Sequence, residues 1–470
     1  MVGAWLVMLV LLLPGVAAGQ LPIAPVAPLP GASIEISPRT PPPPTIPTAP
    51  NVAPPLPPSV TTRPVKTFDF RPTLGVSEEY TDNFNRTSRD PTSNFRSTVF
   101  PGFQVLLDSG FLTGQAAYIL SAFHDSSDGH LGAHHQFTGH LAWQATPRLK
   151  LTLADALTNS DNPAQADRLN LRLARQEFTS NLLSLGSEYS LGTIDTTEYY
   201  RLSTFTSTQQ TTTSHTLGAT GSAPLGQIHV LTLGYEYLSS ETGAGRADTL
   251  TFAGPSTNAT TTGHQVTGSF SRDLTKDATA GVSVAYAARE QIGATGRTTF
   301  TRWNVSLFNN YVVPDKIVVR GSLGVAQLNS GASTGRLLLT SNTDIAYYLG
   351  PAVFGLVLER GFAETFDQGQ NFGVVETSGI SGSVSYRVSP LLTGRISLGY
   401  RENKFTGVGA AGQAARDDKI VTATANLTYQ VLRWLAATMD YTYTESSGTQ
   451  GGFTGFIENR VRAGLTVTLY

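Results

Sequence analysis

The sequence predicts an all-β fold, a transmembrane antiparallel β-barrel of about 18–20 strands that follows a disordered, proline-rich N-terminal segment. Three observations predict this fold. Hydrophobic and polar residues alternate along most of the chain, short turns alternate with long polar loops, and charged residues are few. They make up 14% of the chain, against roughly 25% in soluble domains. The mean hydropathy of -0.07 is compatible with a membrane barrel, because lipid-facing and lumen-facing residues cancel in any window.

Residues 1–19 have the features of a secretory signal peptide. A short apolar stretch covers Trp5–Leu13, and small residues follow at 16–19, as at a cleavage site. No Lys or Arg precedes the apolar stretch, so an uncleaved hydrophobic tail is the alternative. The stretch is too short to cross a bilayer comfortably. No other stretch approaches about 18 consecutive apolar residues, so we expect no transmembrane helix.

Residues 20–65 form a proline-rich segment, densest at Pro41–Pro44 and Pro54–Pro55. Such a chain cannot form helices or sheet ladders and prefers an extended polyproline II conformation. It also lacks the apolar residues needed to fold. We therefore expect a disordered linker in the periplasm, with a docking peptide for a partner protein as the alternative.

Residues 66–470 are expected to form the outer-membrane barrel. At the start of this region Phe68, Phe70 and Leu74 share one parity, while Asp69 and Arg71 take the other. A period of two is typical of a strand with one apolar and one polar face. The pattern recurs in about twenty segments of roughly 10–15 residues. Clear examples lie at 151–153, 183–189, 231–237, 280–286, 303–307, 380–386 and 421–429.

Two kinds of connection join these segments in alternation. The short ones lie at 108–110, 147–148, 224–226, 314–316, 350–351 and 432–433. The long polar ones lie at about 82–94, 126–133, 158–173, 239–261, 402–416 and 445–456. Bacterial barrels place short turns in the periplasm and long loops outside. Both ends of the barrel are then periplasmic, which requires an even number of strands.

Segment length and aromatic placement favour a membrane barrel over a soluble sandwich. Strands that cross the hydrocarbon core need roughly 9–11 residues, whereas soluble strands typically have about 5–6. Tyrosines such as Tyr189, Tyr286 and Tyr429 lie on the apolar parity near segment ends, as in the interfacial girdles of barrels. The sheet must close, because lipid cannot satisfy an open edge. A large soluble all-β protein or a secreted β-repeat protein is the alternative.

The last predicted strand covers about 457–470 and ends on an aromatic residue, Tyr470. A terminal aromatic on an amphipathic last strand resembles the assembly signal of outer-membrane proteins. Here Tyr470 lies off the apolar parity, so the match is imperfect. Outer-membrane lipid and the barrel assembly machinery are the expected partners.

Three runs near the start of the barrel region carry a family resemblance. They are Phe70–Leu74, Glu79–Thr87 with its Tyr-Thr-Asp-Asn step, and Val99–Phe103 with its Pro-Gly step. This part of the chain resembles the opening of the Putative beta-barrel porin 2 family; over the remaining residues the resemblance is only architectural. The resemblance implies a Gram-negative outer-membrane barrel. Related barrels often accompany exopolysaccharide biosynthesis and export systems, and no catalytic residue is implied.

Enzymatic and nucleic-acid-binding functions find little support. The chain has no cysteine and a formal net charge of -2, which excludes thiolate chemistry and gives no basic footprint. Gly331–Gly335 matches G-x-S-x-G, but the next residues, 337–349, predict a strand instead of the helix that a hydrolase elbow needs. His134 and His140 share a strand face but lie about 20 Å apart. We expect no enzyme, no metal and no cofactor.

Polar residues opposite the apolar parity are the candidates for function. A charge facing lipid costs roughly 2–4 kcal/mol at the bilayer midplane, so these side chains are expected to face the lumen. They either pair and stabilise the wall or line a conduit, and we expect lining. The candidates are Asp69, Arg71, Lys150, Arg302, Asn304, Arg320, Asp344, Glu359, Arg387, Arg395 and Asp440.

The expected function is a pore or conduit in the outer membrane for hydrophilic solutes or exopolysaccharide. Both charge signs are present, so strong ion selectivity is not predicted, and long loops could fold inward and narrow the pore. A surface adhesion or binding barrel with functional loops is the alternative of a different class. An enzyme embedded in the barrel is a third.

Overall fold

A computed structural model describes residues 68–165, 175–208, 210–244, 258–293, 296–330, 333–365, 373–406, 417–450 and 453–469. Contacts divide the chain into two units, 1–34 and 35–470, and every described residue belongs to the second. The predictions of a signal peptide over 1–19, of a linker over 20–65 and of a role for Tyr470 lie outside the described residues.

The described chain is almost entirely strand, with one short 3-10 helix, η1, at Pro163–Gln165. Its strands are β1 Phe68–Thr81, β2 Asn94–Asp108, β3 Leu112–Asp125, β4 Leu131–Thr146, β5 Leu149–Ser160, β6 Phe178–Ser190, β7 Asp195–Ser207, β8 Gln210–Pro224, β9 His229–Ala244, β10 Ala259–Thr275, β11 Ala278–Gly293, β12 Gly296–Val313, β13 Ile317–Ser330, β14 Ser333–Leu349, β15 Ala352–Glu364, β16 Val374–Ser389, β17 Leu392–Phe405, β18 Asp417–Leu432, β19 Leu435–Gln450 and β20 Phe453–Thr468.

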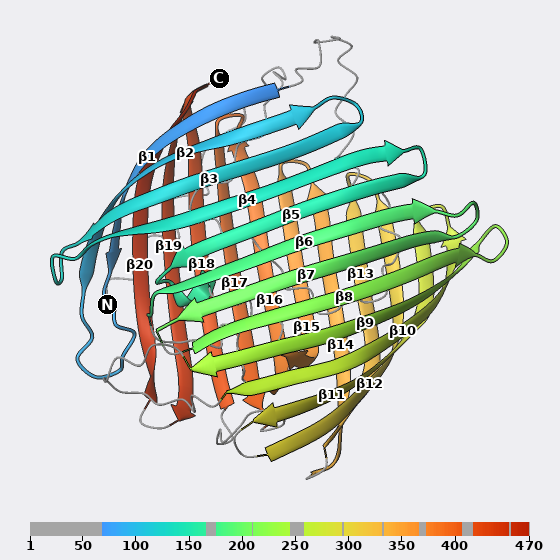
Figure 1. The fold of residues 1–470 in the computed structure, drawn as a ribbon. Helices are drawn as coiled ribbons and strands as arrows, with labels where there is room; N and C mark the ends of the chain where they lie inside the picture. The colour runs from blue at the N-terminus through green and yellow to red at the C-terminus, as the bar shows by residue number, and fades with distance from the viewer. Residues whose placement is uncertain are drawn as a thin grey trace. The chain divides into compact units, whose positions relative to one another are not determined.

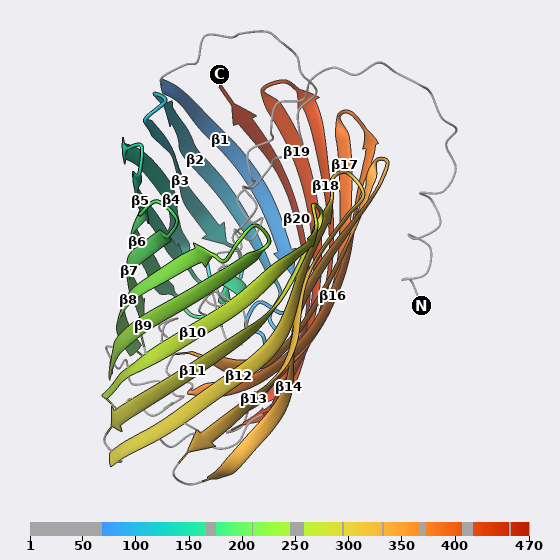
Figure 2. The same cartoon turned by 90° about the vertical axis from the view of Figure 1, so that its right-hand side faces the viewer.

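Each strand pairs antiparallel with the strands before and after it, and β1 pairs with β20. The result is one closed 20-stranded barrel of up-and-down topology, whose strands follow the chain around the wall in Figures 1 and 2. The predicted barrel is confirmed, at the upper end of the expected strand number. The strands have 12 to 18 residues, longer than the 10–15 expected, because several continue into the predicted loops. None of the described helical residues makes a helix long and apolar enough to cross a membrane.

The two faces of the wall differ as the alternation predicts. On β1, Phe68, Phe70, Leu74 and Val76 are exposed apolar side chains, whereas Ser77 on the other parity is buried. In a closed barrel the exposed apolar parity faces lipid and the other parity faces the interior. The two faces are called outward and inward below.

Every connection at one end of the wall is short, with two to four residues between strands, and includes the turn at Gly226, whose φ of 81° suits glycine. Connections at the other end range from 2 to 17 residues. The predicted long loop at 445–456 is wrong, because β19 and β20 extend to Gln450 and Phe453 and leave two residues between them. We call the end at which every connection is short the turn end, and the other end the loop end. Both β1 and β20 have their free ends at the turn end, because Thr73 pairs with Thr468.

Inward-facing aromatic rings cover glycines on the neighbouring strand. In each case the ring and the glycine are opposite residues of the register, and a Cβ atom added to the glycine would overlap the ring. This arrangement shields backbone that lacks a side chain and lets the wall curve. The pairs are Gly75–Phe100, Gly132–Phe123, Gly218–Tyr199 and Gly281–Phe308.

Candidate functional site

All eleven candidate residues lie on strands, on the parity opposite the exposed apolar side chains. For example, Arg302 and Asn304 alternate with outward Val305 and Leu307 on β12. Asp344 on β14 lies between outward Leu339 and Tyr347 by the same alternation. Their role as lining of a conduit remains a proposal.

Six of the candidates form ion pairs along the wall. Arg320 and Asp344 are opposite residues in the register of β13 and β14, and Thr340 donates a hydrogen bond to Asn304 over 3.4 Å. Arg387 and Arg395 are exposed. A charged side chain can pair within the wall and also line a conduit, since a paired charge can still border water. The pairs are Asp69–Arg71 at 2.7 Å, Lys150–Glu188 at 3.0 Å, Arg302–Glu364 at 3.0 Å, Glu359–Arg401, and Asp440–Arg462 at 3.7 Å.

At the loop end, six buried or half-buried charged residues form a network that we call the seam cluster: Arg86, Arg96, Asp125, Asp161, Arg175 and Glu458. Arg96 on β2 donates to Asp125 over 2.7 Å and to Asp161 over 2.8 Å. Arg86, from the β1–β2 connection, and Arg175, from the β5–β6 connection, both bind Glu458 on β20, over 2.8 and 3.0 Å. The three positive and three negative charges balance.

The seam cluster shows that two connections fold inward. Arg175 and Asp161 border the connection between β5 and β6, yet Arg175 reaches Glu458, five strand intervals away around the wall. At about 4.8 Å per interval, that path along the wall is roughly 24 Å. Arg175 also lies over Phe84 of the β1–β2 connection, 4.6 Å from the ring centre. The described residues of these two connections therefore lie on the interior side of the loop end.

Two members of the cluster outside the strands have shifted pKa values. Burial would raise the pKa of Asp161, but hydrogen bonds from Arg96 and the charges of Arg175 and Arg96 outweigh it and lower the pKa to about 2. Burial lowers the pKa of Arg86 to about 10, and the charge of Glu458 opposes that shift. Both groups are ionised at neutral pH, so the network is fully charged there.

A second element folds inward at another part of the wall, at β15 and β16. Strands β14 and β15 pair only up to Ser341 and Arg360, whereas β15 and β16 stay paired to Glu364 and Val374. We call residues 361–365 and 373–377 the β15–β16 tip. Nearer the turn end of these two strands, even-numbered residues such as Phe354 face outward.

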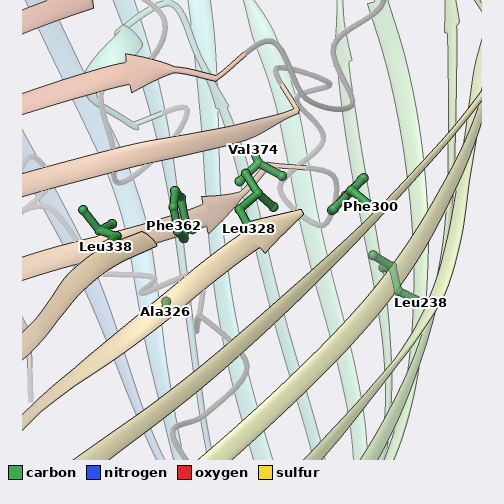
Figure 3. Packing of buried hydrophobic residues seen from close by; sticks show 7 residues of the cluster. All are labelled: Leu238, Phe300, Ala326, Leu328, Leu338, Phe362 and Val374. Atoms are coloured by element: carbon green, nitrogen blue, oxygen red, sulfur yellow. The ribbon is translucent and has the colours of Figure 1, made fainter. Parts of the chain in front are cut away.

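The tip lies inside the wall formed by the preceding strands. Its even-numbered residues Phe362 and Val374 are buried in one cluster with inward-facing Leu328 and Leu338, as Figure 3 shows. The outward parity of the tip therefore packs against the inward parity of β13 and β14. The same cluster extends to Leu238, Phe300 and Ala326.

Ion pairs hold the tip to the inner wall. Glu364 binds Arg289 of β11 over 2.9 Å and Arg302 of β12 over 3.0 Å. Arg302 also donates to the backbone oxygen of Phe362 over 2.9 Å. Glu376 pairs with Arg336 of β14. Because Arg289 is buried, removing its partner Glu364 would leave a buried charge without compensation, which is strongly destabilising.

The seam cluster and the tip narrow the interior from two sides of the loop end. Of their charged residues, only Arg302 was among the candidates from the sequence. The others were missed because their partners lie on distant strands or in connections, where alternation gives no information. The one signal was the Tyr-Thr-Asp-Asn run at 80–83, since Arg86 lies three residues after it.

The histidines do not converge. His134 faces inward and lies 3.8 Å from Asp161, whereas His135 on the same strand binds outward Tyr118. No group of three or more His, Asp or Glu residues in the described part of the chain has a geometry for a metal ion. At the G-x-S-x-G run, residues 331–332 lie outside the described part, and a strand starts at Ser333. The helix that a hydrolase elbow needs does not follow.

Comparison with protein families gives a match in the last quarter of the chain. The family model described as Putative beta-barrel porin 2 matches residues 353–469. The protein is a porin-like β-barrel of the outer membrane. The match names the family expected from residues 70–103, but it covers residues 353–469, where the sequence resemblance was only architectural. The matching family is one of porins and not of enzymes.

No curated protein matches this porin-like barrel. Among solved structures, it is similar to the FrpB iron transporter from Neisseria meningitidis (F3-3 variant), with 11% identity, a TM-score of 0.49, and coverage of 85% of this chain and 82% of that chain. It is also similar to the siderophore receptor PirA from Pseudomonas aeruginosa, with 11% identity, a TM-score of 0.46, and coverage of 87% and 81%.

Proposed function

We propose that the barrel is a passive conduit for hydrophilic solutes, restricted at its loop end by the seam cluster and the β15–β16 tip. The observation that carries this proposal is the polar inward parity of a 20-stranded wall. Barrels of about 16–18 strands already leave an aqueous channel. A lumen of this size is too wide for wall side chains alone to fill. The two inward-folded elements then define the narrowest part.

Charge pairing supports weak ion selectivity. The charges of the seam cluster balance, and the tip carries Glu364 between two arginines and Glu376 beside Arg336. Paired charges of both signs give little net field along the pore. The conduit would therefore favour polar, uncharged or weakly charged solutes.

The inner wall between β8 and β12 is rich in paired hydroxyl groups. Cross-strand pairs such as Ser214–Ser240 at 2.8 Å and Ser283–Ser306 at 2.7 Å are inward and buried. Because these hydroxyls are buried and bind one another, they stabilise the wall and do not themselves contact a solute in the lumen. The family context favours an exopolysaccharide in transit as the specific cargo, and this finer assignment is part of the proposal.

The test is single-channel conductance of the purified, refolded protein in planar bilayers. We expect an open pore whose reversal potential in a salt gradient stays close to zero. The variant Glu364→Gln/Glu376→Gln weakens the ion pairs of the tip, so its conductance should rise. Its size limit for neutral oligosaccharides in liposome swelling should rise as well. Glu188→Gln, at the turn end beside Lys150, is the matched control and should leave both values unchanged.

A barrel without measurable conductance would contradict the conduit and favour the adhesion alternative, in which the loops carry function. Conductance that is unchanged by Glu364→Gln/Glu376→Gln would contradict the restriction by the tip. Exclusion of all saccharides by a conducting barrel would retain the pore and remove exopolysaccharide as its cargo.

A further inference from the structure

Three hydrogen-bonded tyrosine–histidine pairs repeat on the outward face. In each pair the tyrosine hydroxyl lies 2.7–2.8 Å from Nδ1 of a histidine on the next strand. All three pairs are diagonal: the histidine lies two residues nearer the loop end than the residue opposite the tyrosine. The pairs are Tyr118–His135 on β3 and β4, Tyr200–His215 on β7 and β8, and Tyr235–His264 on β9 and β10.

The three pairs lie at one level of the wall. His135, His215 and His264 are four or five residues from the loop-end limits of their strands, at Leu131, Gln210 and Ala259. Five residues correspond to about 17 Å along a strand. The loop-end part of the barrel therefore continues well beyond this level.

The outward residues change character at the level of the pairs. On several strands they are mainly apolar toward the turn end and mainly polar or charged toward the loop end, with Leu131 on β4 and Ile292 on β11 as exposed apolar residues at the loop end. On β10, Val266 and Phe270 lie on the turn-end side of His264, and Thr262 and Thr260 lie on its loop-end side. Two other strands show the same change. On β12, Val305 and Leu307 lie toward the turn end and Thr301 and Thr299 toward the loop end. On β17, Ile396 and Leu398 lie toward the turn end and Glu402 and Lys404 toward the loop end.

The height of the apolar zone fits a bilayer. On β4, outward Trp143 near the turn end is eight residues from His135, or about 27 Å along the strand. With a strand tilt of about 35–45°, this distance gives a zone of roughly 20 Å, close to the apolar band of about 25 Å in such barrels. Asp155, outward on β5, lies opposite Gly139, four residues nearer the turn end than His135. It accepts a hydrogen bond from the Asn181 side-chain amide over 2.9 Å, which reduces the cost of a carboxylate on the turn-end side of the pairs.

We propose that the three tyrosine–histidine pairs bind the phosphate-bearing headgroups of lipid in the outer leaflet. The tyrosine engages Nδ1, and no residue in the described part of the wall engages Nε2 of these histidines. With the tyrosine hydroxyl donating to Nδ1, Nε2 carries the proton and can donate to a phosphate oxygen at the headgroup level. His215 and His264 are exposed and His135 is half-buried, so headgroups can reach them.

The first test measures thermal stability in nanodiscs. Folded protein is placed in discs that contain a bisphosphorylated lipid A, or the same glycolipid without phosphates. We expect the wild-type barrel to unfold at a higher temperature with the phosphates present. The variant His135→Phe/His215→Phe/His264→Phe should lose that shift. His140→Phe, inward on β4, should keep it. An equal shift in the triple variant, or no shift in the wild type, would overturn the proposal.

The second test locates the boundary independently and uses the absence of cysteine from the chain. Thr262→Cys and Val266→Cys place single thiols two residues to either side of His264 on its outward parity. In bilayers, a membrane-impermeant maleimide should label Thr262→Cys and spare Val266→Cys. Labelling of both, or of neither, would place the boundary elsewhere and overturn the proposal even if the triple variant is stable.

Discussion

The carboxylate of Asp82 holds Asn459 at two points across the junction of the first and last strands. Its Oδ1 accepts the backbone N–H of Asn459 over 2.7 Å, and its Oδ2 accepts the Asn459 side-chain amide over 2.7 Å. The junction itself is short, with nine residue pairs between β1 and β20 against fourteen between β1 and β2. Hydrogen bonds to a charged group are stronger than neutral ones, so this clamp reinforces the barrel closure.

We expect Asp82→Ala to destabilise the folded barrel by about 1–3 kcal/mol, because it removes two charge-assisted hydrogen bonds. The measurement is the temperature or urea concentration at which the compact form disappears in semi-native electrophoresis. Asp195→Ala, at the exposed turn-end start of β7, is the control and should change stability by less than about 0.5 kcal/mol. Equal stability of Asp82→Ala and the wild type would show that backbone pairing alone closes the barrel.

The pKa of Asp161 predicts acid release of the β5–β6 connection. Its pKa is lowered from 3.8 to about 2 in the folded protein, so its stabilising contribution is present above about pH 4. That contribution is lost as the pH falls from about 4 to about 2. The shift corresponds to about 2 kcal/mol.

The measurement is unfolding of the wild type and of Asp161→Asn in urea at several pH values between 5 and 2. The difference between the two proteins isolates Asp161 from the other carboxylates. It should be largest at pH 5 and should shrink toward pH 2. A difference that stays constant over this range would contradict the assigned ionic role.

Removal of residues 20–65 should leave the barrel intact. The described strands close on one another without any contribution from this segment, so membrane insertion and the heat-modifiable compact form should persist. Loss of both would contradict a linker role for these residues. A truncation after residue 452, which removes β20, is the positive control for failed closure.

The barrel wall could be predicted from the sequence, but the inward-folded seam cluster and β15–β16 tip could not. Alternation such as that of Phe68, Asp69, Phe70 and Arg71 is a local property, and closure follows because lipid cannot satisfy an open edge. Glu364, in contrast, shares the parity of lipid-facing Phe354 but binds inward Arg289. Nothing in the local sequence marks the point at which β15 leaves β14 and turns inside the wall.

The junction of the first and last strands shows that hydrogen bonds between residues far apart in the sequence are equally hard to predict. In the sequence, the Tyr-Thr-Asp-Asn run at 80–83 carries only a family resemblance. Its role depends on Asn459, which is 377 residues away, and this separation hides the pairing from any local pattern. Strand order alone would have placed β1 beside β20 without identifying which side chains meet.

Substitution of Gly75 should test the aromatic cover on the inner wall. A Cβ atom at this position would overlap the ring of Phe100, its partner in the register. We expect Gly75→Ala to destabilise the barrel by about 1–3 kcal/mol, as for overpacking elsewhere. Because the smaller side chain makes room, Phe100→Leu should recover part of this loss when combined with Gly75→Ala. Gly221→Ala on β8, where nothing lies within 4 Å of an added Cβ, should be tolerated. Equal stability of Gly75→Ala and Gly221→Ala would show that the Phe100 ring does not require glycine at position 75.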